Sequence, residues 1–331
     1  MDISRFCSSG RTPFTIDKTY NLCKLYVTVT TFKQLSLVNK TTGHSPVMMG
    51  PVFVHTNSQS DTYSYFFNKL SMKVRDSDDL VIGTDDEKAI RKAVKSHFPK
   101  SINIVCSSHL KRNILDKLTN VGMPISGRRW VISLIFGESG LMKAKDLLEL
   151  EHRSFVLINY VEQHGNKDIS HYFKSRIIPI IKNGIFRVKK SALIPSLWTN
   201  NNNESVNHVL KQWVDWKMTS LLRLAKLVTE HIKAQYMDVQ RSLFGSGNYR
   251  IVDEYSKFYI QRDDYFALSK VDRDNHFLKF LRYSPKTNES TVVSFDGRLV
   301  VRQCRATSGK KPNQRKRPGS QRTRSIKMKK Y

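Results

Sequence analysis

The most informative segment of the chain reads Val81-Ile82-Gly83-Thr84-Asp85-Asp86-Glu87-Lys88-Ala89-Ile90. Its short apolar run ends in a carboxylate, and a helix-forming pattern follows at once. Further along come Phe98-Pro99, a second apolar run at 102–105 and the sequence Cys106-Ser107-Ser108-His109. A carboxylate at the C-terminal end of a central strand is well placed to bind Mg²⁺, which prefers oxygen ligands. The segment therefore predicts alternating strands and helices with an acidic residue at a strand end.

The flanking sequence extends this pattern in both directions. Runs of β-branched and aromatic residues predict strands at 14–20, 25–32, 50–55, 80–84 and 103–105. Apolar spacings of three and four predict helices at 61–74 and 86–97, the first capped by Asp61. The resulting order, βββαβαβ, is that of the ribonuclease-H-like fold. In that mixed α/β sheet the first three strands run antiparallel and the later ones run parallel to the first.

The remaining sequence predicts a helical unit followed by shorter elements. Helical patterns broken by glycine dominate 110–197, and a polar loop at 198–203 leads into two further helices. Two strands are expected at 290–295 and 299–302. We expect five parts: the first part of the core (1–109), a helical insertion (110–197), helices that complete the core (198–243), a small C-terminal extension (244–300) and a disordered basic tail (301–331).

The net charge points to a polyanionic partner. The chain has 56 Lys and Arg against 28 Asp and Glu, a net charge of +28 and a pI of about 10.0. Such an excess favours nucleic acid as the partner. The tail at 301–331 contains twelve Lys and Arg and no acidic residue. It is typical of a nuclear localisation signal or a nucleic-acid-binding arm, with a merely solvated tail as the alternative.

The same sequence offers no pattern for secretion or membrane insertion. Its N-terminus has no signal-peptide core, and its longest apolar run, 130–136, is far shorter than a membrane helix requires. The four cysteines show no paired spacing, which disfavours a disulfide framework or a cysteine-rich zinc module. We therefore expect an intracellular protein, located in the nucleus, that does not contact membranes.

The order of motifs resembles that of the Mutator-like (MULE) transposases. Their pattern is roughly an apolar strand, Thr-Asp-Gly-Glu, a helix, Phe-Pro, a second strand and Cys-x-x-His. This chain has Thr84-Asp85-Asp86-Glu87 at the first motif, so Asp86 stands where the family usually has glycine. The resemblance covers roughly 14–216. It implies a catalytic fold in which three carboxylates hold two Mg²⁺ or Mn²⁺ ions, one activating the attacking oxygen and the other stabilising the leaving oxygen.

Asp17, Asp85 and Glu204 are the three carboxylates that the resemblance implies. Asp17 follows an apolar run and precedes Thr19 and an aromatic residue, while Glu204 lies in a segment similar to the family's Thr-x-Asn-x-x-Glu-Ser-x-Asn. Each has a structural alternative. Asp17 suits a turn or strand edge, Asp85 or Asp86 suits a helix N-cap, and Glu204 suits a capping arrangement with Asn201.

Cys106 and His109 supply two potential zinc ligands, and a tetrahedral site needs two more. We expect His109 to contact DNA phosphate or to support the carboxylates, and Cys106 to pack as a small buried group. Simple packing of both residues is the alternative. The aromatic run 213–216 is expected to pack in a helix. The expected phosphate contacts are Lys111, Arg112, Arg128, Arg129, Arg187, Lys189 and Lys190.

The leading functional hypothesis is therefore a transposase-derived DNA-processing protein that cleaves phosphodiesters and transfers strands with Mg²⁺ or Mn²⁺. Family members usually carry an N-terminal zinc module, and many carry a C-terminal SWIM finger. Neither pattern occurs in this sequence. A truncated copy, or a domesticated and catalytically inactive nuclear DNA-binding protein, is the main alternative, and a basic RNA-binding protein is a weaker one. Formation of a homo-oligomer stays open.

Overall fold

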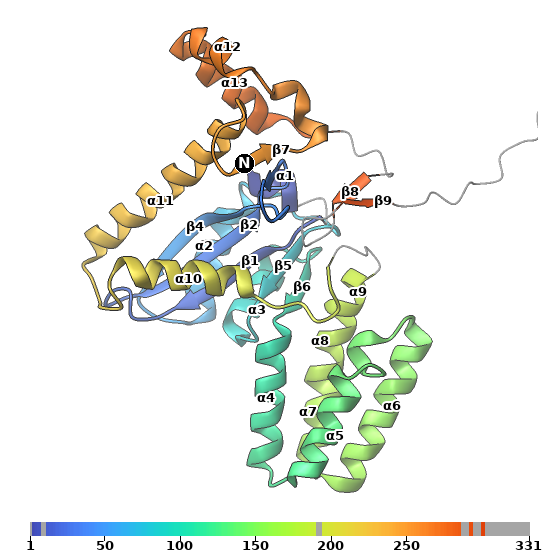
Figure 1. The fold of residues 1–331 in the computed structure, drawn as a ribbon. Helices are drawn as coiled ribbons and strands as arrows, with labels where there is room; N and C mark the ends of the chain where they lie inside the picture. The colour runs from blue at the N-terminus through green and yellow to red at the C-terminus, as the bar shows by residue number, and fades with distance from the viewer. Residues whose placement is uncertain (1, 8–10, 190–193, 286–290, 294–298, 302–331) are drawn as a thin grey trace, which may run out of the picture.

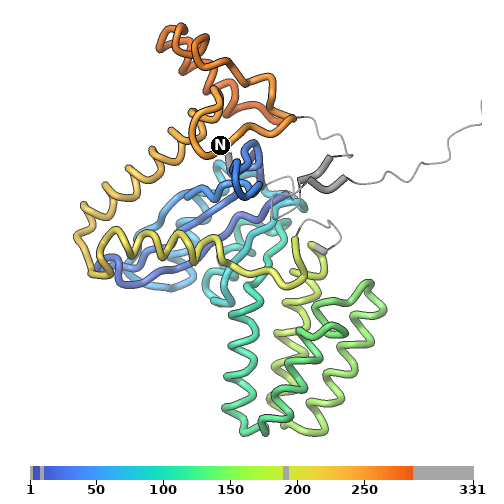
Figure 2. Tube along the Cα trace, viewed as in Figure 1, coloured from blue at the N-terminus to red at the C-terminus, as the bar shows by residue number. Residues whose placement is uncertain are grey.

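A computed structural model describes residues 2–7, 11–189, 194–285, 291–293 and 299–301 (Figures 1 and 2). The basic segment 302–331, for which disorder was predicted, lies outside the described residues, as does Lys190. The chain folds around one mixed sheet whose strands, in spatial order, are β4, β2, β1, β5 and β6. Their bounds are Val47–His55, Tyr26–Lys33, Phe14–Thr19, Val81–Thr84 and Ile102–Val105.

The directions of the strands place β1 at the centre of the sheet. It runs antiparallel to β2, which in turn runs antiparallel to β4. On its other side β1 runs parallel to β5, and β5 runs parallel to β6. All four residues of β5 are buried, as expected for a parallel strand covered on both faces. The predicted mixed α/β class is confirmed, and the five expected strands are present within a few residues of their predicted bounds.

Two pairs of helices cover the two faces of this sheet. Helices α2 (Ser60–Ser71) and α3 (Lys88–His97) pack on the face that carries Ile16 and Ile82. Helices α10 (Asn201–Trp213) and α11 (Leu221–Ser242) pack on the opposite face, against Val29. Because neighbouring strand residues point to opposite faces, Asp17, which pairs with Val29, lies on the α10 face.

A group of helices with its own apolar core extends from the β6 edge of the sheet (Figure 1). Helices α8 and α9 contact β6 directly, which anchors the group to the sheet. A π-helical turn, η2 (Phe173–Ile177), lies between α7 and α8. The other members are α4 (Ser107–Asn120), α5 (Ile125–Phe136), η1 (Leu141–Lys143), α6 (Leu147–His164), α7 (Lys167–Tyr172), α8 (Ile178–Asn183) and α9 (Ile185–Lys189).

The C-terminal elements return to the start of the chain. Strand β7 (Tyr249–Ile251) pairs with β3 (Leu37–Asn39), a short strand that the sequence pattern did not predict. The N-terminal helix α1 (Asp2–Cys7) lies beside these late elements (Figure 2). The remaining elements are η3 (Asp253–Phe258), α12 (Arg262–Ala267), α13 (Lys270–Arg282) and the hairpin of β8 (Thr291–Val293) with β9 (Leu299–Val301).

Three local predictions were wrong. Asp61 does not cap α2, because that helix begins after Gln59 and has no side-chain cap. The segment expected as a polar loop contains the first turn of α10 and a fully buried Trp198. Trp216, expected to pack in a helix, lies beyond α10 with a φ of 57° and a side chain that is 59% exposed.

Trp198 occupies a slot that only glycine leaves open. A Cβ atom at Gly83, in the middle of β5, would lie 2.4 Å from Cη2 of the indole. The backbone around Trp198 is also fixed, because Ser107 donates its N–H to the Trp198 carbonyl at 2.8 Å. This packing holds the segment between the helical group and α10 against β5 of the sheet.

We expect Gly83→Ala to destabilise the protein by about 1–3 kcal/mol, because a methyl group there overlaps the indole. Thermal or denaturant unfolding measures the change. A double-mutant cycle with Trp198→Phe is the control, since phenylalanine lacks the benzo atoms that reach Gly83. The cost of Gly83→Ala should be clearly smaller in the Trp198→Phe background. If Gly83→Ala destabilised both backgrounds equally, the close packing of the Trp198 indole on Gly83 would not be the cause.

Candidate functional site

Two aspartates meet at the C-terminal ends of β1 and β5. The parallel register pairs Ile16 with Thr84, so the next residue of each strand is Asp17 and Asp85. The two carboxyl groups form a hydrogen bond, which requires a shared proton. Burial, together with the charge of Asp85 and this hydrogen bond, raises the pKa of Asp17 to about 7, although nearby His109 acts in the opposite direction. Asp17 is only 9% exposed.

Glu204, the third predicted carboxylate, lies at the rim of this site. It belongs to the first turn of α10 and is exposed to solvent. Its charge adds a small increase to the pKa of Asp17, which shows that it lies within electrostatic reach. The structure therefore brings Asp17 and Asp85 into contact and leaves Glu204 beside them. The alternative in which Glu204 caps its helix with Asn201 is wrong, because the N-cap is Asn200 and has no side-chain cap.

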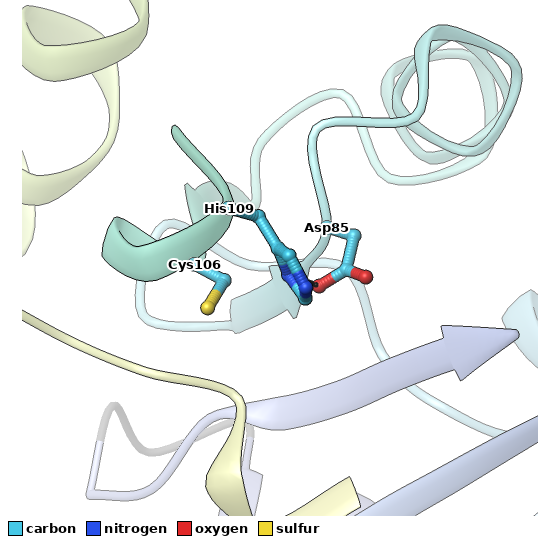
Figure 3. A group of neighbouring side chains, drawn as sticks. All are labelled: Asp85, Cys106 and His109. Carbon is cyan, nitrogen blue, oxygen red and sulfur yellow. Dashed lines mark hydrogen bonds and ion pairs between the residues drawn. The ribbon is translucent and has the colours of Figure 1, made fainter. Parts of the chain in front are cut away.

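His109 forms an ion pair with Asp85. Its Nδ1 lies 2.7 Å from Oδ1 of Asp85, and Figure 3 shows the imidazole directed from α4 toward the carboxylate. Hydrogen bonds with Asp85 and then Cys106 raise the pKa of His109 to about 10. The imidazole is therefore charged at neutral pH and pairs with the Asp85 carboxylate. Of the two roles predicted for His109, support of a carboxylate is the one that the geometry shows.

Cys106 lies directly before α4 and is fully buried. Burial alone would raise the pKa of its thiol, but hydrogen bonds with His109 and with the backbone N–H of Asn200 lower it on balance. The Asn200 nitrogen lies 3.4 Å from Sγ. Cys106 packs in the apolar core of the helical group, and its thiol also interacts with His109. Donor atoms of Asp85, Cys106 and His109 all lie within 4.8 Å of one another, close enough to hold a metal ion.

Three asparagines of the α10 segment fasten it to β1. Asn207 donates to Oδ2 of Asp17 at 2.7 Å, and Asn200 donates to the Ile16 carbonyl at 3.3 Å. Asn203 lies between them and donates to Oδ1 of Asn200 at 3.0 Å. No role was predicted for these side chains. Their spacing of three and four residues, which places them on one helix face, is the signal that would have identified them.

The carboxylate after Asp85 faces away from the site. Asp86 accepts hydrogen bonds from Arg91 at 3.1 Å and from Arg176 at 2.7 Å, and its side chain is 1% exposed. The alternative in which Asp85 or Asp86 caps α3 is wrong, because Glu87 is the N-cap and forms no side-chain cap. Asp86 is therefore a structural clamp between α3 and η2, and Asp85 is the aspartate that the site contains.

The predicted phosphate-contacting residues are spread over the helical group. Lys111 and Arg112 are exposed on α4, one turn or less beyond His109. Arg128 instead donates to Oγ1 of Thr119 at 2.6 Å, within the group itself. Arg187 forms an ion pair with Asp78. Of the predicted residues whose side chains the structure describes, Lys111 and Arg112 are those that lie beside His109 in the chain and are exposed.

The donors of the site suit a divalent cation. Asp17 and Asp85 lie side by side, and the raised pKa of Asp17 keeps its carboxyl group protonated up to about pH 7. The side-chain oxygens of Asn203 and Asn207 are buried without a hydrogen-bond partner. Carboxylate and amide oxygens are the ligands that Mg²⁺ and Mn²⁺ prefer. A cation between the aspartates would replace the proton that they share.

The comparison with protein families agrees with this geometry. Residues 14–113 match the MULE transposase domain. The match spans β1 to the first half of α4 and so includes Asp17, Asp85, Cys106 and His109. The predicted resemblance is confirmed for this segment, which points to a transposase-related function and to interaction with DNA. No curated protein matches the sequence. Among the described residues, no helix is long and apolar enough to span a membrane.

Replacing Asp17 should alter how stability depends on pH. A carboxyl group with a pKa of about 7 in the folded protein, against an ordinary 3.8, favours the folded state when protonated. Its contribution is complete below pH 3.8 and is lost as the pH rises through 7. Without added metal, Asp17→Asn should therefore become more stable than the parent by a few kcal/mol at pH 8. Thermal unfolding between pH 5 and 8 checks this, and parallel curves would exclude the raised pKa.

Replacing Asp85 should free His109. The first cause of its raised pKa is the hydrogen bond with Asp85, so Asp85→Asn should lower the pKa from about 10 toward the ordinary 6.5. An NMR titration of the imidazole resonances measures this shift. His231, whose pKa is lowered by burial alone, should titrate unchanged in the same spectra. An unchanged His109 would show that another group holds its proton.

Proposed function

We propose that the chain is a transposase-derived DNA-processing protein that cleaves phosphodiester bonds and transfers strands with a divalent cation. Asp17, Asp85 and Glu204 are the proposed ligands of Mg²⁺ or Mn²⁺. The observation that carries the proposal is the contact between Asp17 and Asp85 on adjacent parallel strands, with Glu204 within electrostatic reach. Two neighbouring carboxyl groups, of which that of Asp17 is buried, are costly to hold together unless a cation or a proton compensates their charge.

The arrangement of the strands supports a ribonuclease-H-like core. Three antiparallel strands, of which the central one is β2, are followed by two strands parallel to β1. Helices lie between the last three strands of this set, as in the predicted order βββαβαβ. On this proposal, 110–197 is an insertion between the second and third carboxylates, and 198–243 completes the core.

The side chains around the aspartates have separate roles in the proposed reaction. When bound, the cations activate the attacking oxygen and stabilise the leaving oxygen. Asp17 gives up its proton as the ligands assemble, because its pKa of about 7 lies near neutral pH. Asn207 orients the Asp17 carboxylate through its hydrogen bond. His109 pairs with Asp85 and adds positive charge beside the proposed metal ligands.

An inactive DNA-binding protein is the second candidate function. It is favoured by the ion pair of His109 with Asp85, which already engages one carboxylate oxygen, and by the exposed position of Glu204. In that case the fold and its positive charge would persist without catalysis. In both cases we propose DNA as the partner and the nucleus as the location, since the net charge is +28.

Calorimetric titration of Mn²⁺ into the full chain tests the proposal. The parent should bind Mn²⁺ with saturation and release protons near pH 7, because Asp17 must ionise. Asp17→Asn and Asp85→Asn should each weaken binding by about 100-fold or more, since loss of outer partners alone costs 10–100-fold. Glu204→Gln should cost less, given its exposed position. A labelled DNA duplex then reports nicking, which the same substitutions should abolish.

Cys106→Ser is the control for metal type. Thiolate and imidazole ligands suit Zn²⁺, whereas Mn²⁺ prefers oxygen. Cys106→Ser should therefore leave Mn²⁺ binding unchanged while weakening any binding of Zn²⁺. If Mn²⁺ binding requires Cys106, the site is the Asp85, Cys106 and His109 group. If no metal binds to the folded parent, the inactive DNA-binding protein is the correct function.

A further inference from the structure

A basic cleft lies on the other side of the sheet edge from the carboxylates. Its volume is about 870 Å³, and it lies between α3 and β6 on one wall and α7 to α9 on the other. Asp86 links the two walls, because it bonds to Arg91 of α3 and to Arg176 of η2. Both arginines also line the cleft.

The lining of the cleft carries an excess of positive charge, of which its three lysines supply the part that is unpaired among the described residues, because its three arginines form ion pairs with Asp86 and Asp78. Six of its side chains are Lys or Arg, and one, Asp168, is acidic. Lys88 and Lys95 are exposed, and within the described part of the chain they form no ion pair. The cationic side chains of the cleft are Lys88, Arg91, Lys95, Lys117, Arg176 and Arg187.

The arrangement of these cations favours an extended anion over a compact one. Lys88, Arg91 and Lys95 lie on one face of α3 and extend over about 10 Å of its axis. Lys117 of α4 and Arg176 supply charge from other elements. A single phosphate would be contacted by only one end of such a row, whereas a strand with regularly spaced phosphates can follow it.

One polar atom of a cleft-lining arginine is buried without an acceptor. The Nε–H group of Arg91 has no hydrogen-bond partner among the described residues. Burying a donor without an acceptor is costly. Arg91 and Arg176 are also close enough to repel each other, which an added anion would relieve.

We propose that this cleft binds the sugar–phosphate backbone of a DNA strand, as a second site separate from the carboxylates. The identity of the strand as DNA rests on the proposed function. Lys88 and Lys95 contact successive phosphates on one wall, and Lys117 contacts the strand from another. The clamp of Asp86 with Arg91 and Arg176 fixes the two walls at the distance that the strand requires.

The test is fluorescence anisotropy with a labelled single-stranded DNA of about 16 nucleotides, titrated with the full chain over a series of salt concentrations. The cleft variant is Lys88→Glu/Lys95→Glu. The matched control is Lys226→Glu/Lys233→Glu, which has the same spacing on one helix, α11, and the same change in net charge. Lys117→Glu is a second variant from another wall. All four substituted lysines of the two pairs lie on helix surfaces, so folding should be retained, as circular dichroism will show.

The cleft variant should bind DNA about tenfold more weakly than the control. Its slope of log affinity against log salt should fall by about 1.4, the value for two lost phosphate contacts on a single strand. Lys117→Glu should lower the slope by about half as much. Equal losses in the cleft and control variants would overturn the proposal, because the loss would then follow net charge alone.

Two competition arms identify the source of the phosphates. Unlabelled RNA of the same sequence should compete no better than DNA, and ATP at millimolar concentration should compete poorly. If RNA or ATP competes strongly with the parent and the control variant but not with the cleft variant, the occupant of the cleft is not a DNA strand. Mn²⁺ titration of the cleft variant should match the parent. Weaker DNA binding by the cleft variant with normal Mn²⁺ binding tests the cleft proposal alone. Absence of Mn²⁺ binding in the parent would count against the proposed function and leave the cleft proposal unaffected.

Discussion

The seating of Trp198 against Gly83 is the contact on which the site depends. It fixes the chain at the point where it returns from the helical group to the sheet, just before α10 begins. From there, Asn200 reaches the backbone of β1 and Asn207 reaches the carboxylate of Asp17. Glu204 lies one turn of helix beyond Asn200, in the first turn of α10. The position of Glu204 beside the aspartates therefore depends on how the indole of Trp198 packs against Gly83 of β5.

The site concentrates negative charge in a protein that is strongly positive overall. Asp17 is buried and Asp85, beside it, is partly exposed. The folded protein compensates with a proton on Asp17 and with the His109 imidazolium beside Asp85. Neither compensation is as strong as a bound cation would be. The resulting cost is of the kind that functional sites retain, because the same electrostatic tension favours ligand binding. The neighbouring Asp86 avoids that tension by pairing with two arginines.

Local patterns in the sequence predicted the strands of the sheet, because strand periodicity is visible within each segment. The grouping of Asp17 with Asp85 was predicted only through the resemblance to the MULE transposases, since each residue alone also suits a turn or a helix cap. They could not predict that Trp198 is buried, since the surrounding run of asparagines suggests a loop. The partners of Asp86 were equally hidden, because Arg176 lies far along the chain. The short strand β3 was not predicted, because its partner β7 is distant in sequence. Contacts between segments distant in sequence depend on tertiary packing, which propensity does not encode.

Helix α1 has a consequence for how the protein is made. Arg5 donates to the carbonyls of Phe280 and Leu281 at the end of α13, across a separation of 275 residues for the first of these bonds. Contacts so distant along the chain close late, because the intervening residues must be present and ordered first. During synthesis, α1 therefore forms its contacts with α13 only after almost the whole chain has left the ribosome. The N-terminal segment is in this sense the last piece of the folded body to be secured.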